Sequence, residues 1–198
     1  MTYKIVDAVQ TVAPVVEPVT VAEAKSHLRV DGSDSDTYIG TLIIAARQMV
    51  ENWMQRSLVQ RTYRADVSGF AYGFDLPYKP LASLSSVKYY NTDSPQVLTT
   101  LDSSYYRADL LRGEIYLDVG AIIPSVSTQH DAVQITYVAG YEPSADSPQD
   151  HAGNVPNAIK AAILLVVGHL FENREATSQL RIQELPTVEM LLSGYRYY

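Results

Sequence analysis

The 198-residue sequence contains no cysteine and comparatively few basic residues. Without cysteine the chain has neither a disulfide scaffold nor a thiolate metal site, so its fold does not depend on the redox state of its compartment. Fifteen Lys and Arg residues stand against 22 Asp and Glu, which gives a net charge of −7. Because neutralising phosphates needs clustered cations, this balance argues against a protein that grips nucleic acid over a broad basic face.

Targeting signals, long apolar runs and common catalytic motifs are missing as well. The N-terminus, Met-Thr-Tyr-Lys-Ile-Val-Asp, has no continuous apolar stretch followed by a cleavage site, so we expect no signal peptide. The most apolar segment, Ala161 to Phe171, has eleven residues, and a bilayer-spanning helix needs about twenty. The sequence also contains no glycine-rich phosphate loop and no nucleophile elbow.

The periodicity of the apolar residues divides the chain into helical ends and a β middle. Hydrophobic residues make up 46% of the chain, which is enough for a substantial core. The period is helical over residues 18–56, close to two from Leu58 to Tyr141, and helical again after residue 153. We therefore predict an α+β fold with an N-terminal helical part (1–57), a β insertion (58–141), a linker (142–153) and a C-terminal helical part (154–198). The two helical ends form one bundle in this prediction, and the insertion is an all-β sandwich or barrel-like subdomain.

Individual elements follow from local signals. Thr20 and Glu23 have the spacing of a capping box and open a helix through Leu28. The acidic and serine-rich turn 31–36 offers caps for a second helix from Asp36 to Gln55, with Arg47 and Glu51 opposite its apolar face. We expect seven strands, at 58–67, 71–76, 86–91, 96–101, 104–110, 113–118 and 131–138.

The helix that begins near Pro156 and ends near Phe171 is apolar around nearly its whole circumference. One amphipathic face against one core does not account for such a helix, so its other faces need partner helices from this chain or from a neighbour. A loop follows over 176–186, then a short helix to Leu192 and the aromatic, basic tail Gly194-Tyr195-Arg196-Tyr197-Tyr198. The pattern indicates an assembly protein.

Several short motifs occur in a fixed order along the chain. They are Glu17-Pro18-Val19-Thr20-Val21-Ala22-Glu23-Ala24-Lys25-Ser26-His27-Leu28-Arg29-Val30-Asp31, Trp53-Met54-Gln55-Arg56-Ser57-Leu58, Leu76-Pro77 with Pro80-Leu81, Tyr137-Val138-Ala139-Gly140-Tyr141, Val155-Pro156 with Ile159-Lys160, and Gly168-His169-Leu170-Phe171-Glu172-Asn173-Arg174-Glu175. As an ordered set covering about residues 17–196, they resemble the head–tail connector, or adaptor, family of tailed bacteriophages and prophages.

This resemblance implies a structural virion protein without catalytic activity and without a cofactor. Such proteins form a ring, commonly of twelve subunits, beneath the portal of the DNA-filled head. The expected partners are other copies of the chain, the portal protein, and the next connector, stopper or tail-terminator protein. Double-stranded DNA would pass through the channel without specific binding. The resemblance places the protein in the virion neck, after assembly in the host cytoplasm.

Two groups of residues are candidates for protein contacts. Tyr and Arg are the residue types that anchor interfaces, so the tail residues Tyr195, Arg196, Tyr197 and Tyr198 are predicted to dock on the portal. The second group lies near the end of the apolar helix, where we expect bundle or subunit contacts. It consists of His169, Phe171, Glu172 and Arg174.

Other readings of the sequence involve ligands or catalysis. His169 and Glu172 are spaced i, i+3 on a helix, and with His27 and His151 they are the candidate metal ligands. A di-metal bundle needs a second carboxylate-and-His pair on a facing helix, and the sequence has only one, so a metal site is disfavoured. A calcium loop at Asp31, Asp34 and Asp36 lacks its closing glutamate, and capping explains these residues better. A glycosidase-like acid pair is the enzymatic alternative, drawn from Asp102, Asp109, Glu114 and Asp118.

The main alternative function is a carbohydrate-binding or adhesin-type β module. Exposed aromatic rings stack on sugars, and most of the fifteen tyrosines fall in the β region. Tyrosine is also a common strand residue with a polar end. The residues concerned are Tyr63, Tyr72, Tyr78, Tyr89, Tyr90, Tyr105, Tyr106, Tyr116, Tyr137 and Tyr141.

Overall fold

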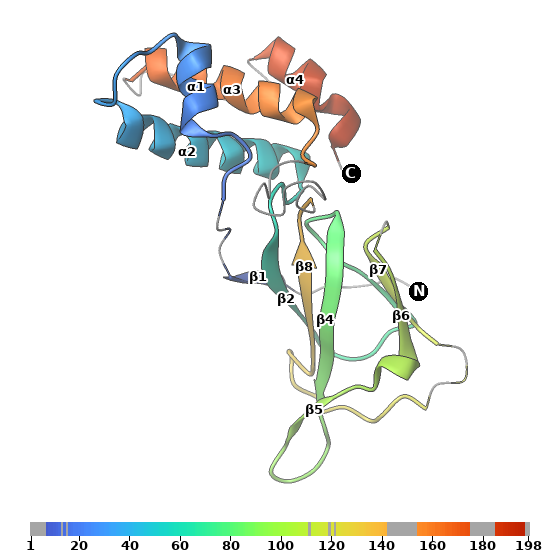
Figure 1. The fold of residues 1–198 in the computed structure, drawn as a ribbon. Helices are drawn as coiled ribbons and strands as arrows, with labels where there is room; N and C mark the ends of the chain where they lie inside the picture. Colours follow the sequence, from blue (N-terminus) through green and yellow to red (C-terminus); the bar gives the residue numbers. More distant parts are fainter. Residues whose placement is uncertain are drawn as a thin grey trace. The chain divides into compact units, whose positions relative to one another are not determined.

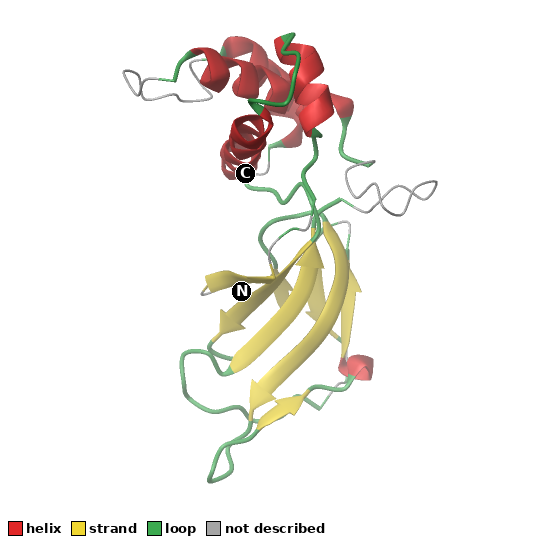
Figure 2. Ribbon diagram, turned by 60° about the vertical axis from the view of Figure 1, so that its left-hand side comes forward, coloured by secondary structure: helices red, strands yellow, loops and turns green. Residues whose placement is uncertain are grey.

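The computed structural model describes residues 7–12, 14, 16–110, 112–118, 120, 122–141, 154–174 and 185–196. The chain divides into two compact units. A β unit comprises Met1–Pro14 and Gln60–Gly140, and a helical unit comprises Val15–Val59 and Tyr141–Tyr198. Figure 2 shows the strands in one unit and the long helices in the other. The mixed class of helices with antiparallel sheets, predicted from the periodicity, is confirmed.

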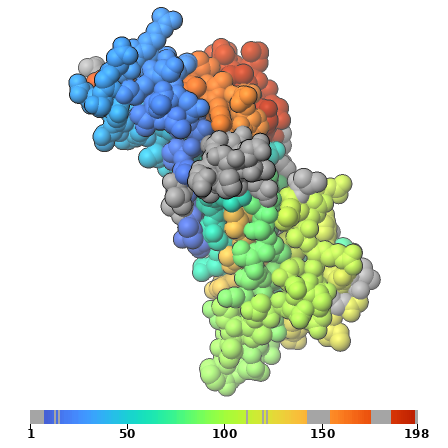
Figure 3. Space-filling view, in the orientation of Figure 1, coloured from blue at the N-terminus to red at the C-terminus, as the bar shows by residue number. Residues whose placement is uncertain are grey.

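The described residues of the helical unit form four α-helices, which are α1 (Val21–Leu28), α2 (Asp36–Met54), α3 (Asn157–Glu172) and α4 (Pro186–Leu192). Helix α3 packs against α1, α2 and α4, and α1 also contacts α2 (Figure 1). In the space-filling view the blue atoms of α1 lie beside the orange atoms of α3 (Figure 3). The shared core is aliphatic and is made by Val19, Ala24, Ile39, Leu42, Ile43, Ala46, Val50, Met54, Leu58, Val155, Ile159, Ala162, Ile163, Val166, Val167, Val188 and Leu192.

The start of α1 is capped as the sequence predicts. The backbone N–H of Glu23 donates to Thr20 Oγ1 at 3.1 Å, and the backbone N–H of Thr20 donates to Glu23 Oε2 at 2.7 Å. These reciprocal bonds satisfy two amide groups that a helix start leaves unpaired. Helix α1 ends at Leu28, and its C-cap residue Arg29 has a φ of 55°, in the left-handed region.

The start of α2 differs from the prediction. Ser35 occupies the cap position but its side chain makes no capping hydrogen bond. Asp36, in the first turn, instead places its carboxylate 2.7 Å from Lys25 Nζ of α1. The negative charge near the helix start is still favourable for the helix dipole, but its nearest partner is a lysine on α1.

In the β unit the described strands form two antiparallel sheets. The larger has the order β1-β2-β8-β4-β5, formed by β1 (Asp7–Val12), β2 (Arg61–Val67), β8 (Val133–Ala139), β4 (Leu81–Tyr90) and β5 (Leu98–Thr100). The smaller has the order β3-β7-β6, formed by β3 (Gly73–Asp75), β7 (Glu114–Leu117) and β6 (Tyr106–Asp109). Residues of both sheets share one core, which includes Tyr63, Ala65, Phe74, Val87, Ile115, Leu117, Ile135 and Tyr137.

Of the two forms predicted for the β insertion, a sandwich or a barrel-like subdomain, the closed barrel is wrong. Among the described strands the larger sheet ends at β1 on one side and at β5 on the other, so it does not close on itself. Strand β5 has only three residues and pairs with β4 alone. A strand this short cannot supply the staggered pairing that closure of a small barrel requires.

In strands β2 and β8, the alternation of residue types along the sequence matches an alternation of burial in the structure. Both alternate strictly between buried and half-buried residues, and they pair over their full length from Arg61↔Ala139 to Val67↔Val133. Strand β1, by contrast, was not predicted, because it lies within the segment that the sequence analysis placed in the N-terminal helical part. The predicted linker 142–153 and most of the predicted loop 176–186 lie outside the described residues.

Candidate functional site

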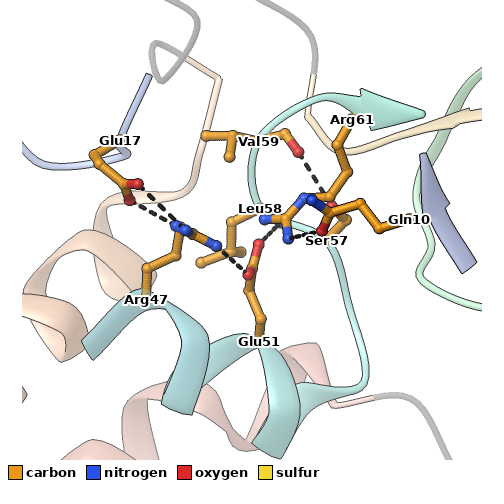
Figure 4. Close-up of polar contacts among 8 residues, drawn as sticks. All are labelled: Gln10, Glu17, Arg47, Glu51, Ser57, Leu58, Val59 and Arg61. Carbon is orange, nitrogen blue, oxygen red and sulfur yellow. Dashed lines mark hydrogen bonds and ion pairs between the residues drawn. The ribbon is translucent and has the colours of Figure 1, made fainter. Parts of the chain in front are cut away.

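A buried charge network lies inside the helical unit, on α2 (Figure 4). The guanidinium of Arg47 donates from Nε to Glu17 Oε2 at 2.6 Å and from Nη1 to Glu51 Oε2 at 2.6 Å. The second carboxylate oxygen of Glu51 accepts the backbone N–H of Leu58 at 2.8 Å. The network therefore joins the segment before α1, the middle of α2 and the segment that follows α2.

Arg47 and Glu51, which the helical period predicts to lie opposite the apolar face, are buried, with 3% and 7% of their surfaces exposed. Burial by itself lowers the pKa of Arg47, but the hydrogen bond to Glu17 and the charges of Glu51 and Glu17 raise it above its usual value. The arginine remains charged, as a guanidinium in a protein does. Its role is structural, since it holds three segments of one unit together.

An aromatic and basic cluster covers the end of α3, where the sequence predicts contacts. The guanidinium carbon of Arg174 lies 5.0 Å from the ring centre of Phe171 and 5.0 Å from that of Tyr38, at the start of α2. The two rings are 6.0 Å apart. Phe171 is half-buried, whereas Arg174 is exposed. The structure thus brings Phe171 and Arg174 together in an arrangement of residue types that anchors interfaces.

His169 and Glu172, the other two residues of this candidate group, have separate surroundings. His169 is half-buried, and its carbonyl oxygen accepts the N–H groups of Asn173. Glu172 is exposed. Across the part of the chain that the structure describes, no group of three His, Cys, Asp or Glu side chains is arranged to hold a metal ion. His151 lies outside that part.

Helix α3 buries one face fully, and other apolar residues of the helix pack against the same core but are only partly buried. Ile159, Ala162, Ile163, Val166 and Val167 are buried. Leu164 and Leu165 remain half-buried, and on α2 Tyr38 and Ile44 are exposed to 36% and 43%. Of the two predicted sources of cover for α3, this chain supplies α1, α2 and α4. Cover from a neighbouring subunit stays a prediction.

The described half of the C-terminal tail is bound to the end of α2. The 3₁₀ turn Ser193–Tyr195 follows α4, and the backbone carbonyl of Tyr195 accepts a hydrogen bond from Arg56 Nε. The guanidinium carbon of Arg196 lies 4.9 Å from the ring centre of Trp53. Tyr195 also packs against the helical core. Tyr197 and Tyr198 lie outside the described residues.

The β tyrosines are poorly placed to bind sugars. Tyr63 and Tyr137 are buried, and their stacked rings lie 5.7 Å apart. Tyr78 stacks on Tyr63 at 4.6 Å. Of the ten tyrosines named above, Tyr72 is the one whose side chain is exposed, at 58%. A row of exposed rings, which sugar stacking needs, is not formed by these ten residues.

The acids proposed as a glycosidase-like pair each have a structural partner. Asp102 accepts the backbone N–H of Ser104 at 2.8 Å, and these bonds lower its pKa. Asp118 pairs with Arg107 at 3.1 Å. Asp109 accepts the N–H of Arg112 at 3.0 Å, and Glu114 accepts the hydroxyl of Tyr116. These contacts explain the four acids as turn and strand residues.

Comparison with known proteins gives the same family as the ordered motifs. Residues 18–99 match the family described as "Phage gp6-like head-tail connector protein". These residues include the helices α1 and α2 and continue through β5. The resemblance to head–tail connector proteins, predicted from the sequence, is therefore confirmed. A comparison with curated proteins gives no match.

Solved structures of similar fold come from gene transfer agent (GTA) particles. A chain from the "Neck of empty GTA particle computed with C6 symmetry" superposes with a TM-score of 0.74 at 20% identity, over 97% of this chain and 96% of that one. A chain from the "Virion of native gene transfer agent (GTA) particle" gives 0.70 at 21% identity, over 95% and 96%. A third, from the "Neck of native GTA particle computed with C12 symmetry", gives 0.63 at 21%, also over 95% and 96%. The fold is thus shared along nearly the whole length of both chains.

None of the helices in the described parts of the chain is both long and apolar enough to cross a membrane.

Proposed function

We propose that this protein is a structural head–tail connector, a ring-forming component of a phage-like virion neck. The observation that carries the proposal is the match of residues 18–99 to the connector family, in a chain whose fold matches a neck protein at a TM-score of 0.74. The particles with similar chains were treated with C6 and C12 symmetry, which supports a closed ring of copies. The ring lies under the portal and links the DNA-filled head to the tail.

In this proposal the described helices act as one bundle, and residues 60–140 of the β unit are an insertion in the chain between α2 and α3. The bundle supplies the contacts between subunits. The half-buried Leu164 and Leu165 of α3 and the exposed Tyr38 and Ile44 of α2 support this role, because a neighbour can still cover them. Phe171, Arg174, His169 and Glu172 then belong to the edge of the same interface. Double-stranded DNA passes through the ring without specific binding, and the protein has no catalytic activity.

The proposal is tested by measuring the mass of the purified protein by light scattering, alone and with its cognate portal, and by imaging the large species. A closed ring, free or bound to the portal, is the expected result. A monomer that ignores the portal under all assembly conditions would overturn the connector function. Glycan screening of that monomer would then test the carbohydrate-binding alternative, which the burial of the β tyrosines disfavours.

We further propose that the C-terminal tail docks on the portal. The described part of the tail supports this role, because the carbonyl of Tyr195 accepts a hydrogen bond from Arg56 and Arg196 lies over the ring of Trp53 at the end of α2. Deleting Tyr197 and Tyr198 should weaken portal binding and leave the thermal stability unchanged. Arg196→Ala serves as the comparison, since it removes the contact to Trp53. Portal binding that survives deletion of Tyr195–Tyr198 contradicts this role.

A further inference from the structure

The N-terminal strand β1 is weakly anchored to the core of the β unit. From Ala8 to Val12, Ala8 alone packs against the core of the β unit. Val9 and Val12 leave 47% and 54% of their surfaces exposed. Since buried apolar surface is the main favourable term in folding, β1 contributes little to the core and is held mostly through its edge.

Strand β1 is held to β2 in a defined register by backbone pairing and by two side-chain hydrogen bonds. Strand β1 pairs antiparallel with β2 in the register Asp7↔Asp66 to Gln10↔Tyr63, followed by a shift at Val12. Thr11 Oγ1 donates to the carbonyl of Thr62 at 3.1 Å, and Arg61 Nη1 donates to Gln10 Oε1 at 3.2 Å (Figure 4). Backbone pairing gives the strand its affinity and these side-chain contacts set its register.

No short loop connects β1 to β2, the strand with which it pairs. No hairpin joins β1 to β2, because the chain leaves the β unit at Pro14 and returns to it at Gln60 after passing through the helical unit. The strand lies at the outer edge of the sheet, next to β2 (Figure 1). A strand with this placement is joined to its own sheet only by way of another unit. A second copy of the chain can offer β2 the same strand with the same contacts.

We propose that β1 is exchanged between subunits, so that in the assembled ring Asp7–Val12 of each copy pairs with β2 of its neighbour. The proposal rests on the ring-forming function proposed above. Exchange of an identical element costs little, because every hydrogen bond of the closed monomer is remade with the partner. Within a ring the neighbour's strand is held at high local concentration, which favours the exchanged form. Each copy donates one strand and accepts one, and such a head-to-tail contact closes into a ring.

The natural absence of cysteine makes a crosslinking test direct. Val9 and Arg64 are register partners on β1 and β2, and both side chains are at least partly accessible. Directly opposed residues on antiparallel strands have Cβ atoms about 4.5–5.5 Å apart, which is close enough for a disulfide after small adjustment. The double variant Val9→Cys/Arg64→Cys is assembled with the portal, oxidised and run on a denaturing gel without reductant.

Exchange predicts a ladder of covalent species larger than the monomer from the ring fraction, with the monomer band lost in proportion to oxidation. A mixture of the single variants Val9→Cys and Arg64→Cys should give covalent dimers. The matched control is Arg64→Cys/Thr136→Cys, which joins the register partners on β2 and β8. Its disulfide should stay within one chain, and the protein should migrate as a monomer.

The outcomes separate the two proposals. Rings that yield only internally crosslinked monomers from the Val9→Cys/Arg64→Cys variant overturn strand exchange and leave the connector function intact. Failure of the unmodified protein to form any ring with the portal overturns the connector function, and strand exchange with it. As a second measurement, deletion of residues 1–12 should lower the fraction of protein in rings by tenfold or more while the helical content of the monomer stays unchanged. Undiminished ring assembly by this truncated protein also overturns strand exchange.

Discussion

Arg47 holds a full positive charge with 3% of its surface exposed, between the carboxylates of Glu17 and Glu51. Such a network adds little net stability compared with an apolar replacement of all its members, but removing one member is costly. The remaining charges stay buried without their partner. The network therefore sets how the segment before α1 and the segment after α2 meet that helix.

We predict that Arg47→Met destabilises the helical unit by about 3–5 kcal/mol, because two carboxylates lose their shared cation. Urea unfolding followed by circular dichroism measures the change. Lys25→Met is the matched control, since it breaks the more exposed pair of Lys25 and Asp36 and should cost within about 1 kcal/mol. Equal effects of the two variants would contradict a structural role for the network.

In the β unit, Tyr137 is a buried polar residue, as Arg47 is in the helical unit. Its side chain is fully buried and its hydroxyl donates to the carbonyl of Pro77 at 3.1 Å. Burial raises the pKa of Tyr137, and the neighbouring Tyr63 and Tyr78 raise it further. In the unfolded chain a tyrosine releases its proton near pH 10. The folded protein retains this proton to higher pH, so above about pH 10 the unfolded state binds fewer protons and stability falls as the pH rises.

We predict that Tyr137→Phe costs about 1 kcal/mol at neutral pH, where the hydrogen bond to Pro77 is lost. Above pH 10 the variant should lose stability less steeply than the original protein, by up to about 1.4 kcal/mol per pH unit. Chemical denaturation at a series of pH values between 7 and 11.5 measures both effects. Parallel stability curves for the two proteins would show that Tyr137 does not drive the alkaline loss.

At the scale of the elements, the two helical glycines Gly168 and Gly40 differ in how closely a neighbouring helix approaches them. In α3, a Cβ added at Gly168 would lie 3.5 Å from His27 Nε2 and 3.9 Å from Leu28 Cδ2, both on α1. In α2, a Cβ added at Gly40 would have no atom of another residue within 4 Å. Gly168 therefore lies where α1 and α3 meet, and Gly40 does not lie at a contact.

We predict that Gly40→Ala and Gly168→Ala each stabilise the helical unit by about 0.5–1 kcal/mol, because alanine loses less backbone entropy in a helix. Gly168→Leu should instead destabilise it by about 1–3 kcal/mol, since the larger side chain forces α1 away from α3. Thermal melts of the three variants test this. Stabilisation by Gly168→Leu would contradict the close packing of these helices.

Features of this fold differ in how far apart in the sequence the residues that produce them lie. The capping spacing of Thr20 and Glu23 and the alternation in β2 and β8 depend on neighbours in sequence, so all were predictable. Strand β1 has exposed residues at four successive positions, Val9 to Val12, and so carries no alternation to detect. The pairing of Arg47 with Glu17 spans 30 positions and has no local signature, because only the folded helical unit brings the two together.

At the scale of the whole molecule, each unit has a core of its own. The helical core is aliphatic, and the β core includes the stacked tyrosines Tyr63 and Tyr137. The chain crosses between the units three times, after Pro14, after Val59 and after Gly140. Separate cores within one chain favour separate cooperative unfolding transitions.

We predict two transitions in scanning calorimetry of the protein before ring assembly. Arg47→Met should lower the transition of the helical unit. Ile135→Ala, which removes a fully buried side chain from the β core, should lower the other by an amount equivalent to about 2–5 kcal/mol. A single transition that both variants shift equally would mean that the two units unfold together.

The sequence by itself determined most of the helices and strands, the class of fold and the resemblance to the connector family, because capping, periodicity and ordered motifs depend on residues close together in the chain. The sequence also indicated that α3 is too apolar to pack against a core through one face alone. Tertiary structure decided which charges are buried and that the larger sheet stays open between β1 and β5. It also decided that the tail residues Tyr195 and Arg196 lie on α2. These features depend on contacts between residues far apart in the chain, whose energies arise only when the segments pack together.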